Sequence, residues 1–321
     1  MLDLIGVPFD LCGRSRGSAL GPVAMRIAGL HEALTDLRLE WRDLGDLETE
    51  PDPEPITQDG LRNFAGAVSS YELVKQTVRD SILSGNVPVV MAGDHSNSIG
   101  SISGALEATN GELSVLWIDA HADLNTPESS PSGNLHGMPV AALLGLPANS
   151  DGILGAQWRH LIECVIPMTR LKRDHIAWLG LRAVDHGERM IISTLSGCFA
   201  TTMQDIDRHR VDRVVDAFVH WMKARKGQKL WISFDVDVLD PVFAGGTGTA
   251  VMGGLSYREG HFLAELLHQA AMTHDIELVG LDVVEVNPLL DANNMTAKFA
   301  VEWLCSLFGK QILEGHDRVQ F

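Results

Sequence analysis

Three short motifs hold the side chains best suited to binding metal ions: GDHS at 93–96, DAHAD at 119–123 and DVD at 235–237. Carboxylates and imidazoles are common protein ligands of divalent cations. Each motif comes directly after a short apolar run that is typical of a buried strand. A single DxH motif would more often be a loop cap beside a structural histidine, but three motifs at three strand ends favour one shared site.

The side chains of these motifs are expected to converge. Ligands bind beyond the carboxyl ends of parallel strands, and alternate residues of an extended chain lie on one face. This alternation places Asp119 with His121 and Asp123, and it places Asp235 with Asp237. The candidate metal ligands are therefore His95, Asp119, His121, Asp123, Asp235 and Asp237.

Four carboxylates at one end of a buried sheet repel one another and lose hydration unless positive charge compensates them. Neither acidic motif contains Lys or Arg, so metal is the expected compensation. The ligands are too many for one tetrahedral ion, but they suit two ions that share carboxylates. A ligand set that is rich in oxygen and lacks thiolate favours Mn²⁺, with Co²⁺, Ni²⁺ and Fe²⁺ as alternatives.

The elements that must position these motifs alternate along the chain as short apolar runs and longer helical patterns. This alternation predicts an α/β fold with a parallel sheet and helices on both of its faces. The predicted strands are 4–7, 87–92, 113–119, 176–181, 229–234 and 277–284, and the predicted helices include 61–83, 211–226 and 257–272. The acidic segment 48–56 is expected to be a surface loop. Because no linker rich in Pro, Gly or Ser interrupts the pattern, we expect residues 1–321 to form a single domain.

Charge and composition exclude several classes of protein. The 321 residues include 42 acidic and 25 basic side chains, a formal net charge of −17, whereas a protein that neutralises nucleic-acid phosphates is expected to be basic. No apolar run approaches the roughly 18 residues of a membrane span, and the N-terminal MLDL lacks the basic region of a secretory signal. The cysteines lie too far apart for a zinc ribbon or a disulfide framework, at Cys12, Cys164, Cys198 and Cys305. We expect a soluble, cytoplasmic protein that binds neither nucleic acid nor membrane.

Longer segments around the motifs resemble the arginases of the ureohydrolase family, which also contains agmatinases and formiminoglutamases. These segments follow the family's order over nearly the whole chain. They are MAGDHSNSIGSISG (91–104), WIDAHADLNTPESSPSGNLHGMPV (117–140), GLRAVDHGE (180–188), SFDVDVLDPVFAGGTGTAVMGGLSYREG (233–260) and GLDVVEVNP (280–288). The resemblance implies a three-layer α/β/α sandwich with a central eight-stranded parallel sheet. It also implies a hydrolase of linear amidines that depends on two Mn²⁺ per chain.

The resemblance also implies a division of labour among the candidate residues. One metal is expected to be bound by His95, Asp119, Asp123 and Asp235, and the second by His121, Asp119, Asp235 and Asp237, so that Asp119 and Asp235 bridge. Asp123 is further expected to orient a metal-bridging hydroxide as the nucleophile. His136 matches the family's proton shuttle, a role that suits an imidazole because its pKa lies near neutrality. Glu285 matches the carboxylate that pairs with the substrate guanidinium.

L-Arginine, cleaved to L-ornithine and urea, is the substrate that the resemblance favours. The matching loop implies that Asn125, Ser132 and Asn134 contact the α-carboxylate. Asp185, with Glu188 nearby, matches the partner of the α-amino group, and Thr249 matches a further substrate contact.

Three departures from the family pattern lie beside this pocket. His186 stands where many arginases have proline, Ala183 stands where many have aspartate, and FAGG at 243–246 replaces a loop richer in proline. They leave open, as the alternative, an agmatinase-like or guanidino-acid ureohydrolase that acts on another guanidino compound.

Other classes fit the sequence less well. The glycine-rich segment 245–254 lacks the GK[ST] of a phosphate-binding loop. A mononuclear zinc deacylase needs only about three protein ligands, fewer than the six candidates here. A non-catalytic scaffold of this fold would be expected to have lost some of the six. The resemblance implies a homo-oligomer, a trimer or a hexamer, and Arg258 and Glu259 are candidates for pairing between subunits.

Overall fold

One parallel sheet runs through the computed structural model, which describes residues 1–49, 60–225, 228–273 and 276–313. Its eight strands lie in the order β2-β1-β3-β8-β7-β4-β5-β6. Every pair of neighbouring strands is parallel. The strands are β1 (Leu2–Val7), β2 (Trp41–Asp46), β3 (Val87–Ala92), β4 (Ser114–Ile118), β5 (Ile176–Leu181), β6 (Phe199–Thr202), β7 (Lys229–Asp235) and β8 (Glu277–Val284).

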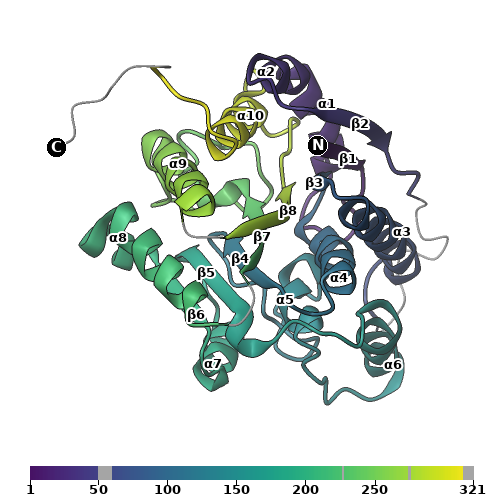
Figure 1. Cartoon of the computed structure of the whole chain (residues 1–321). Helices are drawn as coiled ribbons and strands as arrows, with labels where there is room; N and C mark the ends of the chain where they lie inside the picture. Colours follow the sequence, from purple (N-terminus) through teal and green to yellow (C-terminus); the bar gives the residue numbers. More distant parts are fainter. Residues whose placement is uncertain (50–59, 226–227, 274–275, 314–321) are drawn as a thin grey trace.

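Helices cover both faces of this sheet, which makes three layers (Figure 1). One face carries α1 (Gly21–Ile27), α2 (Leu30–Asp36), α8 (Met203–Lys223), α9 (Tyr257–Thr273) and α10 (Met295–Leu307). The other face carries α3 (Phe64–Leu83), α4 (Ser98–Ala108), α5 (Pro139–Leu143), α6 (Gly152–His160) and α7 (His186–Thr194). The predicted α/β/α sandwich with an eight-stranded parallel sheet is confirmed.

The helical periodicity of the sequence explains how a helix attaches to the sheet. In α3, the side chains of Ala67, Tyr71, Val74 and Val78 recur every three or four residues and are all fully buried. They form part of the apolar layer beneath this helix. Such a stripe stabilises the helix mainly by packing, because most of the stability of helices in proteins comes from burial of an apolar face.

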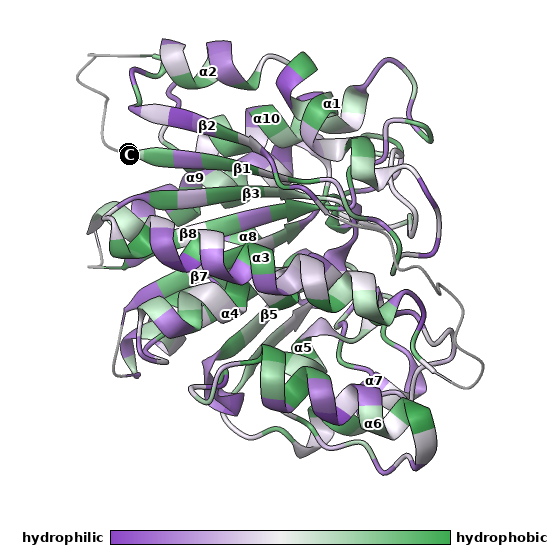
Figure 2. Cartoon of the chain, turned by 90° about the vertical axis from the view of Figure 1, so that its right-hand side faces the viewer, coloured by the Kyte–Doolittle hydropathy of each residue, from purple (hydrophilic) through white to green (hydrophobic). Residues whose placement is uncertain are grey.

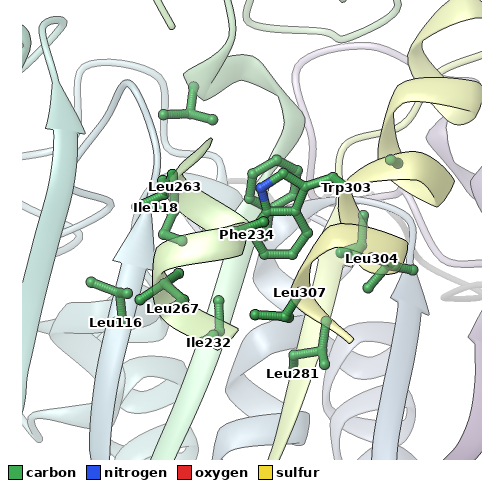
Figure 3. Close-up of a cluster of buried hydrophobic side chains, with 14 of the residues drawn as sticks. Leu116, Ile118, Ile232, Phe234, Leu263, Leu267, Leu281, Trp303, Leu304 and Leu307 are labelled. Carbon is green, nitrogen blue, oxygen red and sulfur yellow. The ribbon is translucent and has the colours of Figure 1, made fainter. Parts of the chain in front are cut away.

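On the opposite face, α9 and α10 close the core over the middle of the sheet. Figure 3 shows side chains from β4, β7 and β8 meeting those of the two helices. At the centre of this cluster the rings of Phe234 and Trp303 stack with centroids 3.9 Å apart. The close packing fixes the strands from which the polar motifs emerge.

The order of the strands is what brings these motifs together. β3, β8, β7 and β4 are consecutive neighbours in the middle of the sheet, and the view along the sheet in Figure 2 shows the stacked strands running in one direction. Because all of them are parallel, the residues that follow their carboxyl ends meet at one edge. Each of the three predicted motifs, and the segment that contains Glu285, follows one of these four strands.

The predicted strands are all present, with shifts of one or two residues at some ends. The structure adds β2 and β6, the two edge strands, which the sequence did not reveal. In β2 half-buried and exposed residues alternate, and β6 has only four residues, so neither forms the apolar run that identifies a central strand. Figure 2 shows more hydrophilic colour on β2 than on the central strands.

The predicted helices are also present. The helix predicted at 211–226 begins directly after a kink at Arg210, which has φ 68°. α8 also includes a helical segment before the kink, which starts at Met203 after a capping box of Thr202 and Asp205. Residue 226 and residues 50–56 of the predicted loop 48–56 lie outside the described residues. Among the described residues, no helix is long and apolar enough to cross a membrane.

Candidate metal centre and substrate pocket

The turn after β3 delivers His95 to the sheet edge. Gly93 makes this turn possible, because a Cβ at this position would lie 2.1 Å from the carbonyl oxygen of Phe9. Asp94 then starts a 3₁₀ turn, and its carboxylate accepts a hydrogen bond from the Ser96 backbone N–H at 3.0 Å. His95 is the first residue of that turn and is only 1% exposed.

His95 Nδ1 faces three carboxylates. It lies 3.0 Å from Asp119 Oδ2 and 3.1 Å from both Asp123 Oδ2 and Asp235 Oδ2. The imidazole ring stacks on the indole of Trp117, with centroids 4.0 Å apart and an angle of 6° between the ring planes. The ring is therefore held in one plane, with Nδ1 aimed at the carboxylates.

A second cluster forms around His121. Its Nδ1 lies 3.0 Å from Asp237 Oδ2 and 3.3 Å from Asp119 Oδ1. Asp119 thus belongs to both groups, with one oxygen toward each histidine, and the three ligand atoms of each group lie close enough to share an ion. Asp235 contacts the first group through Oδ2, while its Oδ1 accepts a hydrogen bond from the Asp237 backbone N–H at 2.7 Å.

The side chains converge for a different reason than the strand alternation predicted from the sequence. β4 ends at Ile118, so residues 119–123 do not form an extended strand in which alternate side chains share a face. Asp123 instead has a left-handed backbone, with φ 49°, a conformation that non-glycine residues adopt rarely and often at functional sites. A turn, and not strand alternation, brings Asp123 back toward His95.

The electrostatics of this cluster call for additional positive charge. Burial and the neighbouring carboxylates raise the pKa of Asp123 and Asp235, and they raise the pKa of Asp237 to about 6. Burial alone would lower the pKa of each histidine, but the carboxylates around them raise the pKa of His95 and bring that of His121 to about 12.

For Asp119, burial opposes ionisation, but hydrogen bonds with both histidines lower its pKa. All of these pKa shifts have one cause: four carboxylates and two imidazoles lie close together and largely away from water, so negative charge is in excess.

Arg182 approaches this cluster but binds backbone oxygens and not its carboxylates. The guanidinium of Arg182 donates hydrogen bonds to four backbone carbonyls. They belong to Asp237 (2.6 Å), Val238 (3.1 Å), Leu239 (3.2 Å) and Val251 (2.8 Å). It therefore braces the backbone that carries Asp237. Two divalent cations would balance the negative charge of the four carboxylates, and the two imidazoles could bind them in the neutral form. The donor set therefore fits a pair of hard ions such as Mn²⁺.

His136 and Glu285 meet beside this cluster. His136 Nδ1 lies 3.1 Å from Glu285 Oε1, and the same oxygen accepts a hydrogen bond from the His95 backbone N–H at 3.0 Å. Glu285 has a left-handed backbone with φ 63°, which turns the chain sharply after β8. Burial alone would lower the pKa of His136, but the Glu285 carboxylate raises it to about 9.

A cavity of about 350 Å³ opens above these residues, a size that suits a small substrate. His121, Asp123, Asp235 and His136 lie in its lining. All of the predicted substrate contacts line it too, and they are Asn125, Ser132, Asn134, Asp185, Glu188 and Thr249. The structure thus gathers every predicted site residue at one edge of the sheet, and their functional roles remain predictions.

Hydrogen bonds within the lining fix the acidic side of this pocket. Asp185 and Glu188 form the capping box of α7, and Asp185 Oδ2 accepts a hydrogen bond from Asn125 Nδ2 at 2.7 Å. Asn125 Oδ1 in turn accepts one from Ser129 at 2.7 Å. Burial and the nearby Asp123 raise the pKa of Glu188 to about 7.

Other contacts connect the lining to the ligands and to the rim. Thr249 Oγ1 donates a hydrogen bond to Asp237 Oδ2 at 2.9 Å. Asn134 Oδ1 accepts one from Arg62 Nη1 at 3.3 Å, and the Asn134 backbone N–H donates one to Ser132 Oγ at 3.2 Å.

Sequence reasoning missed several residues at this site. Arg14 and Ser130 also line the pocket, and Arg182 supports Asp237 although it lies in a motif that was recognised. An isolated arginine or serine carries no pattern of its own. Ser130 and Arg182 lie inside the recognised segments 117–140 and 180–188, and this was the available signal for both.

Comparisons of the sequence and of the structure both identify arginases as similar proteins over nearly the whole chain. A family model described as "Arginase family" matches residues 2–309. An arginase of Staphylococcus aureus is 40% identical over 315 residues, covering 97% of this chain and 98% of its own length. The crystal structure of arginase from Bacillus subtilis matches with a TM-score of 0.83 at 36% identity, covering 98% of this chain and 100% of that one. The native arginase structure from Bacillus caldovelox matches with a TM-score of 0.85 at 36% identity, covering 97% and 99%.

Proposed function

The chain belongs to the arginase family, and we propose on that premise that it hydrolyses L-arginine to L-ornithine and urea at a binuclear metal centre. The observation that carries this proposal is the pair of ligand groups joined by Asp119 beneath a cavity of about 350 Å³. A protein that used this fold only for binding would not need two such groups of buried carboxylates, which are costly to keep together.

We propose that the six ligands hold two Mn²⁺ ions. His95, Asp119, Asp123 and Asp235 would hold one, and His121, Asp119, Asp235 and Asp237 the other. When bound, such ions supply a nucleophilic water at neutral pH by lowering its pKa. The oxygen-rich donor set supports Mn²⁺, and Co²⁺, Ni²⁺ and Fe²⁺ have the same kind of chemistry to offer.

The protein's own groups would then orient the substrate and move protons. Glu285 is buried, and its Oε1 lies 3.1 Å from Nδ1 of His136, which lines the cavity. We propose that Glu285 pairs with the guanidinium of the substrate, which a carboxylate recognises by charge and by parallel hydrogen bonds. Asp123 would orient the attacking water through its carboxylate.

We propose that His136 holds the proton that the departing amine requires. Its pKa of about 9 keeps the ring protonated at neutral pH, and it lies next to Glu285, hence next to the proposed guanidinium position. Protonation of the leaving group by a positioned imidazole typically contributes about 10²–10⁴ in rate.

The far end of the pocket would recognise the amino-acid part of the substrate. The acidic pair Asp185 and Glu188 would receive the ammonium group, and Asn125, Ser132 and Asn134 would donate to the carboxylate; that all five line one cavity supports this assignment. Thr249, which is bonded to Asp237, would contact the substrate near the reacting carbon.

The fold and the cysteines support two further proposals. The single sheet that contains strands from residue 2 to residue 284 supports one domain over 1–321. The four cysteines form no disulfide, in keeping with a cytoplasmic protein.

We also propose a homo-oligomer, a trimer or a hexamer. Arg258 pairs with Glu265 of its own chain at 2.7 Å, so a subunit contact at Arg258 would have to extend or replace this pair. The mass of the purified protein in solution tests this proposal.

The test of function is the release of urea and ornithine from L-arginine by purified protein loaded with Mn²⁺. Metal analysis of the same preparation should give about two ions per chain, as expected for a site with bridging carboxylates. Absence of urea from every guanidino compound offered would reject the proposal.

A further inference from the structure

Asp282 is a fully buried carboxylate in the middle of the sheet, and the proposed reaction gives it no role. It lies in β8, the strand between β3 and β7, and it is register partner to Ser233 of β7. Its exposed fraction is 0%. A buried ionisable group is costly unless its partners justify it, so the identity of those partners matters.

Three side chains donate hydrogen bonds to this carboxylate. Ser233 Oγ donates to Asp282 Oδ1 at 2.5 Å. On the other oxygen, Ser101 Oγ donates at 2.6 Å and Trp231 Nε1 at 2.9 Å. Ser101 and Trp231 fix the carboxylate in place, which leaves Oδ1 for Ser233.

Ser233 connects Asp282 to the candidate metal centre. Its Oγ lies 2.9 Å from His95 Nε2 and 3.3 Å from Ser98 Oγ. A hydroxyl has one proton to donate and two lone pairs to accept with. Because Ser233 gives its proton to Asp282, it can only accept from His95, so the His95 proton must be on Nε2.

The consequence appears on the other side of the same ring. A neutral imidazole with its proton on Nε2 has a lone pair on Nδ1, and Nδ1 is the atom that faces Asp119, Asp123 and Asp235. His121 has no comparable partner for its Nε2 among the described residues, and its side chain is 25% exposed. Of the two histidines, His95 is therefore the one whose Nε2 proton is fixed by a hydrogen bond, to Ser233 Oγ.

We propose that Asp282 is a positioning residue that acts through Ser233 to hold His95 in the tautomer that binds metal. This inference rests on the proposed role of His95 as a ligand. Groups that orient a ligating histidine from behind typically account for about 10- to 100-fold in metal affinity. Here the orienting carboxylate is one hydroxyl further away than in a direct carboxylate–histidine pair.

Asp282→Asn tests the proposal with little change in shape. Trp231 and Ser101 both donate to one side of the new amide, so its oxygen belongs there and its NH₂ faces Ser233. The NH₂ group can only donate, so the Ser233 hydroxyl would turn its proton toward His95 Nε2. The proton of His95 would then have to lie on Nδ1, where it blocks metal binding.

The measurement is Mn²⁺ binding to the whole purified protein, followed by the electron paramagnetic resonance of free Mn²⁺. We expect Asp282→Asn to weaken one of the two sites by about 10- to 100-fold. Ser233→Ala removes the same connection without altering the carboxylate and should weaken the same site. Because both residues act in one chain of hydrogen bonds, the double variant should be no more than about twofold weaker than the weaker single variant.

Asp3→Asn is the matched control. Asp3 is another fully buried aspartate of the same sheet, bonded to Arg42, Ser81 and Asn86 and far along β1 from the site. Its substitution should lower the melting temperature and leave Mn²⁺ affinity unchanged. If Asp282→Asn lowers the melting temperature in the same way while both Mn²⁺ sites keep their affinity, Asp282 is only structural and the proposal fails.

The outcome also separates this inference from the proposed function. Wild-type protein that binds Mn²⁺ but releases no urea from L-arginine would reject the function and leave the role of Asp282 to be decided by the binding data. Wild-type protein that binds no Mn²⁺ would overturn both.

Discussion

His136 Nδ1 lies 3.1 Å from Glu285 Oε1, although 149 positions separate the two residues in the sequence. His136 belongs to a 3₁₀ turn that starts at Leu135, and Glu285 follows the central strand β8. The contact places the proposed proton donor against the proposed guanidinium partner. Since a negative neighbour stabilises the imidazolium, the pair explains why the pKa of His136 rises to about 9 despite burial.

Glu285→Gln should bring the pKa of His136 down toward the usual value of 6.5. The carboxylate is the main group that raises it, and burial acts in the opposite direction. The pKa can be followed by NMR titration of the His136 ring protons in protein without Mn²⁺, which would otherwise broaden the signals. A His136 that still titrates near 9 in this variant would show that other carboxylates control it.

The same pair has a predictable effect on stability. A histidine whose pKa is raised by folding stabilises the protein below its unfolded pKa of about 6.5, and this contribution is lost as the pH rises through the folded value of about 9. Glu285→Gln should therefore lower the free energy of unfolding more at pH 6 than at pH 9.5. Urea denaturation at the two pH values measures the difference, and an equal loss at both would contradict the pairing.

Asp123→Asn should lower kcat by several orders of magnitude. The substitution removes a proposed ligand and the acceptor that orients the attacking water in a single step, and a neutral amide is a poorer ligand for a hard cation. Bound Mn²⁺ and the rate of urea release are measured on one preparation. Asp216→Asn, an exposed aspartate on α8, controls for loss of charge. Near-normal kcat with two ions bound would remove Asp123 from the ligand set.

His136→Ala should lower kcat by about 10²–10⁴, the usual contribution of a positioned acid or base. Its Mn²⁺ content should not change, because His136 is not among the proposed ligands. His209→Ala, at an exposed position of α8, is the control. If the variant loses metal together with activity, His136 supports the centre and its role as proton donor is wrong.

The ligand motifs could be predicted from the sequence because each one is a short run of residues next to a recognisable strand. GDHS, DAHAD and DVD each follow an apolar run, and parallel strands deliver such segments to one edge. The detailed reason was partly wrong, since Asp123 reaches His95 through a left-handed turn. The backbone conformation of a single residue cannot be predicted from a pattern of apolar and polar residues.

The supporting residues could not be predicted in the same way. Ser233 and Asp282 lie inside runs that are otherwise apolar, and a single polar residue in such a run indicates only a strand. Their contact depends on β7 and β8 being neighbours, and the order of strands in a sheet is a property of the tertiary structure. Arg182 likewise acts on carbonyls 55 to 69 positions away, which no sequence spacing reveals.

The choice of substrate depends on the end of the pocket that would bind the amino-acid part of L-arginine. If Asp185 receives the ammonium group and Asn125, Ser132 and Asn134 receive the carboxylate, L-arginine should be used far better than agmatine, which has no carboxylate. A site built to bond a missing group can discriminate by about 10⁴, although water in an open pocket could reduce the ratio of kcat/KM to about 10². Agmatine or 4-guanidinobutanoate used as well as L-arginine would contradict the assignment of arginine and leave the hydrolysis of guanidino compounds intact.

Asp185→Ala should then raise KM for L-arginine and change kcat little. The ammonium group is distant from the reacting carbon and is bound equally in the ground state and the transition state, so its loss affects binding more than turnover. The substitution also removes the capping box of α7 and should lower stability by about 1 kcal/mol. Thr202→Ala, which removes the capping box of α8, has the same structural cost away from the pocket and should leave KM unchanged. A substrate without an amino group separates the two possible roles of Asp185. Because 4-guanidinobutanoate has a carboxylate but no ammonium group, Asp185→Ala should impair its use less than it impairs the use of L-arginine, and an equal loss for both substrates would show that Asp185 only shapes the pocket.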